Sequence, residues 1–250
     1  MSQSNSPYTV IITRPSPYGE ALCTALDEQG FYSIHKPLIT FEQDWQFDAT
    51  QRFEQLSQAS TWIFVSRQAV TYCFDSFKQK QLQDLLKLST EKMVIAVGAA
   101  TADSLQQLDF KPLIPPTPNS EGMIQLLDTY QRKQYPALLI RGNKGRELLE
   151  QYFDNGNLSF LPVYQRLPTN NTLPPLASNA NTAIVVTSGQ LMELVAEHYT
   201  DDPERLTIIA GSGRINKMAQ HMGFTNCYTA KDASNLELVK TCILWRNNIN

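Results

Sequence analysis

The sequence lacks any apolar run near the roughly 20 residues that span a bilayer, and it has few metal-binding side chains. Its three histidines lie apart from one another, and its four cysteines form no C-x-x-C pair. Such pairs are typical of zinc and redox sites, so we expect no metal and no disulfide framework. The thiols are predicted to be reduced and mostly buried: Cys23, Cys73, Cys227 and Cys242.

The chain also lacks a block of lysine and arginine. With 21 basic and 24 acidic residues its formal net charge is −3, which does not favour nucleic acid as a partner. Residues 1–7 are polar and lack the basic and apolar segments of a signal peptide, so we expect a cytoplasmic protein. An anionic small molecule stays compatible with this charge, because helix ends bind anions locally.

What the sequence does contain is an internal repeat. Its 250 residues exceed the usual size of one domain and fit two domains of about 120 residues. Three kinds of strand-then-helix segment occur in one order and then recur in the same order. The pairs are 10–22 with 138–149, 63–70 with 185–192, and 94–105 with 208–218.

Chemically similar residues fall in register within these pairs. Arg and Glu stand six residues apart in both copies of the first segment, as Arg14 with Glu20 and as Arg141 with Glu147. The second segment carries a serine and a glutamine at matching positions in both copies. The repeat therefore duplicates polar positions as well as the apolar core.

Short apolar runs predict the strands. Residues 9–12, 63–65, 138–140 and 184–186 are typical of strands buried on both faces of a parallel sheet. Alternation of these runs with helices predicts βαβ units. Each half of the repeat is therefore expected to form a small, doubly wound α/β sheet.

Helix ends are predicted from local residues. In the first helix Ser16 is placed to cap the start, Pro17 fits the first turn and Gly30 can end the helix. Ser120 and Ser234, which follow the third segment of each half, are predicted to cap later helices.

A proline-led, extended segment follows each copy of the first segment, at 37–41 and 162–166. If both are linkers, the N-terminal segment joins the last two segments of the chain in one domain, and the middle of the chain forms the other. The repeat by itself is equally compatible with two consecutive domains.

Six short motifs are spread over nearly the whole chain. They are Thr13-Arg-Pro15 with Gly19-Glu20, Pro37-Leu-Ile-x-Phe41, Ala96-Val-Gly98-x-x-Thr101-Ala102, Leu139-Ile-Arg141-Gly-Asn-x-Gly-Arg-Glu147-Leu148, Tyr164-Gln-Arg166 and Val186-Thr-Ser-Gly189. Together they resemble the uroporphyrinogen-III synthase family, and the stretches 141–147 and 164–166 are a close match to its bacterial members.

The resemblance implies two flavodoxin-like, doubly wound α/β domains joined by a two-stranded β-ribbon, with the active site in the cleft between them. The expected domains are residues 1–36 with 168–250, and residues 42–160. The expected linkers are 37–41 and 161–167.

The resemblance also implies a reaction. Enzymes of this family cyclise hydroxymethylbilane, a chain of four pyrroles with eight carboxylates, to uroporphyrinogen III of tetrapyrrole (heme) biosynthesis. Water is lost and the last ring, ring D, is inverted, through an azafulvene cation and a spiro-pyrrolenine, without cofactor or metal. The site then needs an acid and groups that bind anions. We expect a monomer, because no exposed apolar helix stripe stands out.

Tyr164 is the residue where the resemblance places the family's suspected acid. A phenol is protonated at neutral pH and can donate a hydrogen bond to the departing hydroxyl. The alternative is an aromatic side chain that only packs a ribbon between the domains.

Arg14 and Arg141 follow strands at equivalent positions, where a guanidinium can bind a substrate carboxylate with two hydrogen bonds. The alternative for each is an ion pair within its own repeat, with Glu20 or Glu147. Arg146 is expected to have a local or solvated role.

Several hydroxyl and glycine residues end strands or begin helices. Ser66, Thr187 and Ser188 are predicted to cap helices or to bind carboxylates together with exposed backbone N–H groups, and the two roles can coexist. The same class of candidate binding position includes Gly98, Thr101, Ser120, Gly142 and Gly211.

Two rival functions stay open. The turn Gly211-x-Gly213 with Asp232 downstream superficially resembles a dinucleotide-binding turn, but the third glycine is missing. Members of the resembled family often have a Gly-Pro-x-Thr-like turn here, so Arg214 either replaces a threonine contact or lies at the surface. The other rival is a non-catalytic, two-lobed anion-binding module.

Overall fold

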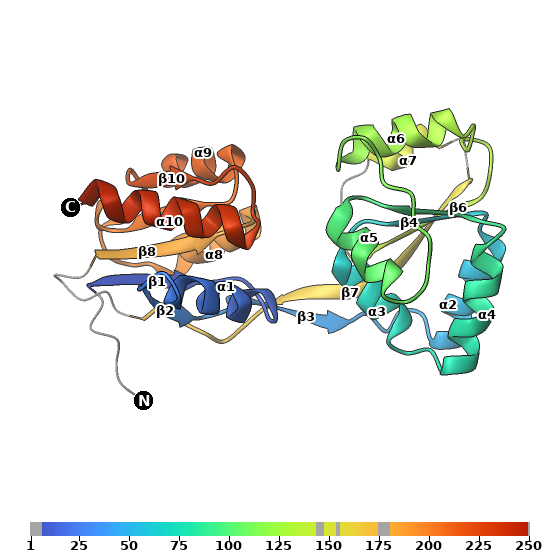
Figure 1. Cartoon of the computed structure of the whole chain (residues 1–250), viewed down its shortest axis with the longest axis horizontal. Coiled ribbons are helices and arrows are strands. Elements are labelled where there is room, and N and C mark those ends of the chain that lie inside the picture. Colours follow the sequence, from blue (N-terminus) through green and yellow to red (C-terminus); the bar gives the residue numbers. More distant parts are fainter. Residues whose placement is uncertain (1–6, 144–147, 154–155, 175–180, 250) are drawn as a thin grey trace. The chain divides into compact units, whose positions relative to one another are not determined.

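The computed structural model describes residues 7–143, 148–153, 156–174 and 181–249 (Figure 1). The chain divides into two compact units: unit 1 is Met1–Thr40 with Leu167–Asn250, and unit 2 is Phe41–Arg166. Both units are α/β with parallel sheets, as the sequence predicts. Arg146 and Glu147 lie outside the described residues.

Unit 1 contains a parallel sheet of order β2-β1-β8-β9-β10. Numbered along this unit the order is 2-1-3-4-5, which is the flavodoxin-like order. The strands are β1 (Tyr8–Ile12), β2 (Tyr32–His35), β8 (Asn181–Val186), β9 (Thr207–Ala210) and β10 (Cys227–Thr229). The helices are α1 (Tyr18–Asp27), α8 (Gly189–His198), α9 (Gly213–His221) and α10 (Asn235–Ile249), with the 3₁₀ turn η1 (Pro203–Arg205).

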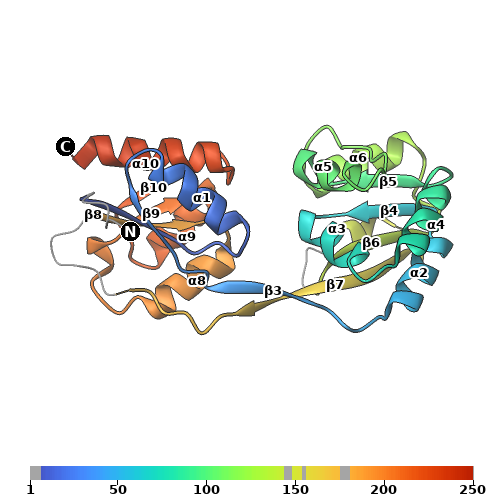
Figure 2. The same cartoon turned by 60° about the horizontal axis from the view of Figure 1, so that its bottom comes forward.

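Helices cover both faces of this sheet, as Figures 1 and 2 show. Alternate residues of β1 point to opposite faces, so Val10 and Ile12 pack with α1 and α10 while Ile11 packs with α8 and α9. These strand residues are fully buried, which explains why the strands have continuous apolar sequences.

Unit 2 contains a sheet of order β3-β7-β6-β4-β5, in which β7, β6, β4 and β5 are parallel. The strands are β3 (Ile39–Gln43), β4 (Thr61–Phe64), β5 (Met93–Ala96), β6 (Ala137–Gly142) and β7 (Leu158–Pro168). The helices are α2 (Ala49–Gln58), α3 (Arg67–Phe74), α4 (Gln79–Ser89), α5 (Ala99–Gln106), α6 (Ser120–Thr129) and α7 (Leu148–Tyr152). The core on one face includes α3 and α5, and the core on the other includes α6 and α7.

The repeat in the sequence reappears in the sheets. The third, second and first segments lie in that order as β9-β8-β1 in unit 1 and as β5-β4-β6 in unit 2. The strand after the first segment, β2 or β7, comes next in each sheet. Leu113 forms a parallel bridge to Ile95 of β5, in the place that β10 takes beside β9. Each unit thus combines a first segment from one copy of the repeat with later segments from the other.

Two strands cross the boundary between the units in the sequence, β3 and β7, and they are hydrogen-bonded neighbours. Tyr164 lies on β7, and the pairing of β7 with β6 extends to Tyr164 opposite Gly142. That these strands act as a ribbon-like linker stays a prediction.

Four predictions for helix ends have different outcomes. Gly30 has φ +78°, and the N–H groups of Gly30 and Phe31 bind the carbonyls of Asp27 and Leu26, so the predicted stop of α1 is confirmed. Ser16 is a wrong prediction: α1 begins at Tyr18 without a side-chain cap, because the Ser16 hydroxyl binds the carboxylate of Glu20.

At the later helices, the Ser234 cap is confirmed, since its Oγ accepts from the Glu237 N–H at 3.4 Å. The Ser120 cap is wrong. Asn119 caps α6 instead, through a hydrogen bond from the Gly122 N–H to its Oδ1 at 2.8 Å. Asparagine at least equals serine as a cap, and it stands one residue earlier.

The described residues contain no helix that is long and apolar enough to cross a membrane. Their four cysteines are free thiols, of which Cys73 and Cys242 are fully buried and Cys23 and Cys227 are half-buried. Burial raises the pKa of the Cys73 thiol and of the Cys242 thiol to about 12. It also raises the pKa of Cys23 and Cys227.

These burials predict the order of thiol labelling at pH 8. Cys73 and Cys242 should not react with a disulfide reagent in the native protein, because almost none of either thiol is ionised or accessible. Cys23 and Cys227 should react slowly, and all four should react in urea. Mass spectrometry of labelled peptides identifies the sites, and prompt native labelling of Cys73 would contradict the described packing.

Candidate functional site

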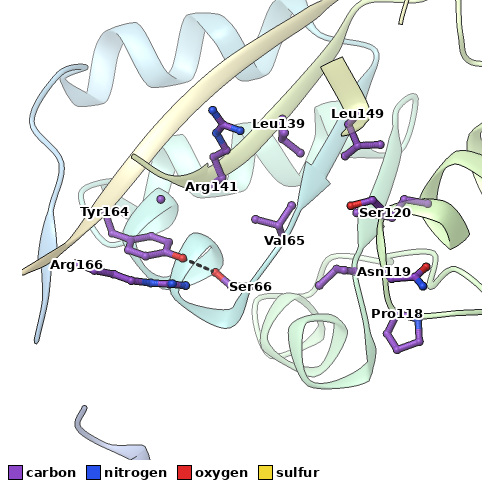
Figure 3. Close-up of a pocket in the computed structure, with 13 residues that line it drawn as sticks. Val65, Ser66, Pro118, Asn119, Ser120, Leu139, Arg141, Leu149, Tyr164 and Arg166 are labelled. Carbon is purple, nitrogen blue, oxygen red and sulfur yellow. Dashed lines mark hydrogen bonds between the residues drawn. The ribbon is translucent and has the colours of Figure 1, made fainter. Parts of the chain in front are cut away.

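A pocket of about 480 Å³ lies in unit 2 at the carboxyl ends of β4, β5, β6 and β7 (Figure 3). The order of the sheet reverses between β6 and β4, and ligands of open α/β sheets bind at such a switch point. The pocket is lined by Val65, Ser66, Val97, Pro118, Asn119, Ser120, Met123, Leu139, Arg141, Gly142, Leu149, Tyr164 and Arg166.

Two helices begin at this pocket with a side-chain cap. Ser66 Oγ accepts from the Ala69 N–H at 3.0 Å at the start of α3, and Asn119 caps α6. Helix N-termini carry partial positive charge and unpaired N–H groups, so they favour anions. The predicted capping role of Ser66 is confirmed, and its predicted contact with substrate stays a prediction.

Tyr164 is buried and its hydroxyl is hydrogen-bonded to another hydroxyl group. The residue is 2% exposed, and its ring packs edge-on against Phe41 at 5.4 Å and beside Tyr72 at 5.8 Å between centroids. Its hydroxyl lies 3.2 Å from Ser66 Oγ and lines the pocket (Figure 3). Two hydroxyl hydrogens belong to this pair, and their mutual hydrogen bond uses one. The other is therefore available to a ligand in the pocket.

A buried arginine holds the segments behind Tyr164. Arg52 is 1% exposed, and its Nη1 donates to the backbone carbonyl of Tyr72 at 3.0 Å while Nη2 donates to that of Asp44. The amide of Gln43 donates to the same Tyr72 carbonyl at 3.3 Å. Burial lowers the pKa of the Arg52 guanidinium. These bonds tie β3 to α3, and so fix two of the rings that contact Tyr164.

Of the arginines predicted for binding, Arg141 lines the pocket, and its Nη1 lies 3.5 Å from a carboxylate oxygen of Glu150. Its guanidinium also lies 4.5 Å from the Phe160 ring centroid. The predicted alternative partner, Glu147, lies outside the described residues. Arg141 is thus ion-paired, but to a carboxylate on α7 that a ligand can replace.

Arg14 belongs to unit 1, where it follows β1. Its Nη1 donates to Oδ1 of Asn235 at 2.9 Å, and its guanidinium lies 5.8 Å from the Tyr18 ring centroid. Glu20, the predicted alternative partner, binds Ser16 and lies 3.6 Å from Nδ1 of His35. The hydrogen bond from Ser16 is the main cause that lowers the pKa of Glu20.

Further predicted positions lie at the carboxyl edge of the sheet of unit 1. Ser188 Oγ accepts from the Leu191 N–H at 3.2 Å, which confirms its predicted cap on α8. Thr187 and Gly211 follow β8 and β9, and a side chain on Gly211 would lie 3.4 Å from the Thr187 Cα. Arg214 lies on α9, where its guanidinium would contact a side chain at position 189.

In unit 2 some of the remaining candidate residues line the pocket and others do not. Ser120 and Gly142 line the pocket. Gly98 is the first residue before α5 and packs on Pro118. Thr101 is 4% exposed within α5 and does not line the pocket. The backbone N–H of Thr101 donates to the Gly98 carbonyl, so this threonine belongs to the first turn of the helix.

Two polar residues of the pocket, Asn119 and Arg166, were not predicted from the sequence as site residues. Asn119 precedes Ser120 and is a strong cap by itself. Arg166 stands two residues after Tyr164, and residues at this spacing on a strand share a face. Both signals were present in the sequence, but the first depended on the start of α6 and the second on the extent of β7.

The sequence was compared with models of known protein families. The family model described as uroporphyrinogen-III synthase HemD matches residues 20–240. The chain belongs to the uroporphyrinogen-III synthase family. This match confirms the resemblance drawn from the motifs.

Curated members of the family are similar over nearly the whole length. Uroporphyrinogen-III synthase of Escherichia coli strain K12 is 28% identical over 249 residues, covering 93% of this chain and 98% of that protein. The Salmonella typhimurium strain LT2 enzyme is 28% identical over 247 residues, with coverages of 93% and 98%.

Solved structures of the family show the same fold. A mutant uroporphyrinogen III synthase of the extremely thermophilic bacterium Thermus thermophilus has a TM-score of 0.63 at 16% identity, covering 97% of this chain and 98% of that one. The uroporphyrinogen-III synthetase of Helicobacter pylori 26695 has a TM-score of 0.59 at 17% identity, with coverages of 97% and 100%.

A metal site has no ligand set in the described part of the chain, where no three His, Cys, Asp or Glu side chains gather. The pocket offers hydroxyl, amide and guanidinium groups instead. These groups bind anions and donate hydrogen bonds.

Replacing Arg52 by Met should destabilise unit 2 by about 2 to 4 kcal/mol, because buried carbonyls lose a charged donor. Urea unfolding followed by far-UV circular dichroism measures the loss. Arg132→Met, at a half-buried arginine that contacts the Tyr135 ring, is the control. A change below about 0.5 kcal/mol for Arg52→Met, the range of ordinary surface changes, would contradict the role given to this residue.

Gly142→Ala should disturb the Tyr164 ring, since the new methyl would lie 2.8 Å from Cε2 and 2.9 Å from Cζ. The ring is held by its neighbours, so we expect a loss of about 1 to 3 kcal/mol in the free energy of unfolding. Gly213→Ala is the matched control, because nothing lies within 4 Å of its added methyl. Equal unfolding midpoints for the two variants would refute the close packing of Gly142 on Tyr164.

Proposed function

We propose that this chain cyclises hydroxymethylbilane to uroporphyrinogen III, the reaction of its family in tetrapyrrole biosynthesis. We propose further that it works as a monomer in the cytoplasm and uses no cofactor. The observation that carries the proposal is the charge of the pocket. Its described lining includes two arginines and two capped helix starts, and it includes no aspartate or glutamate.

The charge of the pocket contrasts with that of the chain. The protein has a formal net charge of −3, so a general attraction for anions is absent. The substrate carries eight carboxylates and needs local groups that replace their hydration. Arginine and helix N-termini supply such groups at one edge of the sheet. The pocket therefore suits part of this substrate, and its 480 Å³ suits one or two of the four rings rather than the whole chain.

Tyr164 supports the chemical step. Loss of the substrate hydroxyl breaks a C–O bond, and the oxygen must receive a proton to leave as water. The Tyr164–Ser66 pair has one hydroxyl hydrogen beyond the one in its own hydrogen bond. Tyr164 donating this proton would leave a phenolate in hydrogen-bond contact with Ser66, beside the azafulvene cation of the substrate. The cation and the phenolate attract each other, so the pair also favours the charged intermediate.

The shape of the site supports control of the product. Free hydroxymethylbilane closes by itself to the uninverted isomer I. An enzyme that yields isomer III must hold the rings so that the inverted closure is faster. The Tyr164 ring is fixed on three sides by Phe41, Tyr72 and the backbone at Gly142, so its hydroxyl has a defined position against the substrate.

Tyr164→Phe should slow the formation of isomer III by roughly 10²- to 10⁴-fold, the usual contribution of general acid catalysis. The test feeds purified protein freshly made hydroxymethylbilane, oxidises the products and separates isomers I and III by chromatography. Tyr130→Phe, at an exposed tyrosine outside the pocket, should leave the rate unchanged.

Isomer I alone from the unmodified protein would overturn the proposed activity and favour an anion-binding module. Isomer III from the unmodified protein and an equal rate from Tyr164→Phe would keep the activity and reject Tyr164 as its acid.

A further inference from the structure

Arg166 is the pocket residue that has no assigned role. It lies near the end of β7, two residues after Tyr164, so both side chains leave the same face of the strand. Its guanidinium carbon lies 6.0 Å from the Tyr164 ring centroid and 5.9 Å from that of Phe41. In Figure 3 the side chain of Arg166 extends along the Tyr164 ring toward Ser66.

The contacts of Arg166 differ from those of the other arginine in the pocket. Arg141 has a carboxylate of this protein at 3.5 Å, from Glu150. Among the described residues, Arg166 has no carboxylate within ion-pair distance and no hydrogen-bond acceptor, and its contacts are with aromatic rings. Its guanidinium N–H groups therefore remain open to a ligand, and its position over two rings limits the freedom it would lose on binding.

Arg166 and Tyr164 are close enough for one substrate ring to contact both, since the guanidinium carbon lies 6.0 Å from the Tyr164 ring centroid. The terminal pyrrole of hydroxymethylbilane carries its hydroxymethyl group and its carboxylate side chains on the same five-membered ring. A carboxylate of that ring bound to Arg166 would therefore direct the hydroxymethyl group toward the Tyr164–Ser66 pair. A carboxylate bound to Arg141, on β6, would approach the same pair from another strand.

Resting on the proposed function, we infer that Arg166 binds a carboxylate of the terminal pyrrole and so positions its hydroxymethyl group at Tyr164. Arg166 then fixes the end of the linear substrate that carries the hydroxymethyl group next to Tyr164. It contributes to binding of the substrate, whereas Tyr164 contributes to the chemical step.

Steady-state kinetics of isomer III formation separate these roles. Arg166→Gln should raise KM by roughly 10- to 100-fold, the value of a charged hydrogen bond, with kcat changed less than KM. The KM of Arg166→Lys should lie between those of the unmodified protein and Arg166→Gln, because lysine keeps the charge and loses the paired N–H groups. Raising the ionic strength should raise KM for the unmodified protein more steeply than for Arg166→Gln.

The matched control is Arg132→Gln, which removes the same charge from the same unit outside the pocket. Its KM should stay within twofold of the unmodified protein. A KM of Arg166→Gln that also stays within twofold would overturn the inference while isomer III from the unmodified protein upholds the proposed function. An equal rise of KM for Arg132→Gln would also overturn the inference, since it would indicate a non-specific charge effect.

Equilibrium binding tests Arg166 without turnover. The probe is uroporphyrin III, a stable octacarboxylate macrocycle, titrated by its fluorescence at low and physiological salt. The dissociation constant should rise roughly 10-fold or more for Arg166→Gln and not for Arg132→Gln or Tyr164→Phe. Unchanged binding by Arg166→Gln would overturn the inference whether or not the unmodified protein makes isomer III.

Discussion

Parallel pairing of β4, β6 and β7 is the constraint on which the pocket depends. The register sets Phe64 opposite Ile140, and Ile140 opposite Leu161, so three segments distant in sequence end at one edge of the sheet. Ser66, Arg141 and Tyr164 follow these paired residues along the chain, toward the same edge. Because these strands point the same way, α3 and α7, the helices that follow β4 and β6, also begin at this edge. The preference of this edge for anions therefore comes first from the direction of the strands, and it does not depend on particular side chains.

The side chains then convert an anion-favouring edge into a defined site. Tyr164 is buried by its own unit, through Phe41 on β3 and Tyr72 on α3, and Arg52 holds both of those elements by backbone carbonyls. A buried guanidinium is costly, and its hydrogen bonds to two carbonyls offset that cost only while the segments stay in place. The position of the phenol is therefore coupled to packing well behind the pocket.

Sequence reasoning succeeded where the cause is local or periodic. The strands, the repeat, the Gly30 stop and the caps at Ser66 and Ser188 each depend on a few neighbouring residues. It failed where two neighbours compete, as at Ser16, which binds a carboxylate one turn away in place of a helix N–H. The partner of Arg141 was not predictable, because Glu150 approaches only through the placement of α7. The burial of Tyr164 likewise arises from β3 and α3, which no local pattern connects to it.

The repeat explains why only one of two similar edges has this chemistry. Segments 37–41 and 162–166 are equivalent, so Tyr164 corresponds to Ile39 and Arg166 corresponds to Phe41. Ile39 is 4% exposed in the core of unit 1, and its side chain can neither donate a proton nor bind an anion. The serine caps of α3 and α8 are kept in both copies, because helix starts need them wherever a strand ends. Duplication therefore supplied two edges that favour anions, and substitution at two strand positions gave one of them a phenol with a cation beside it.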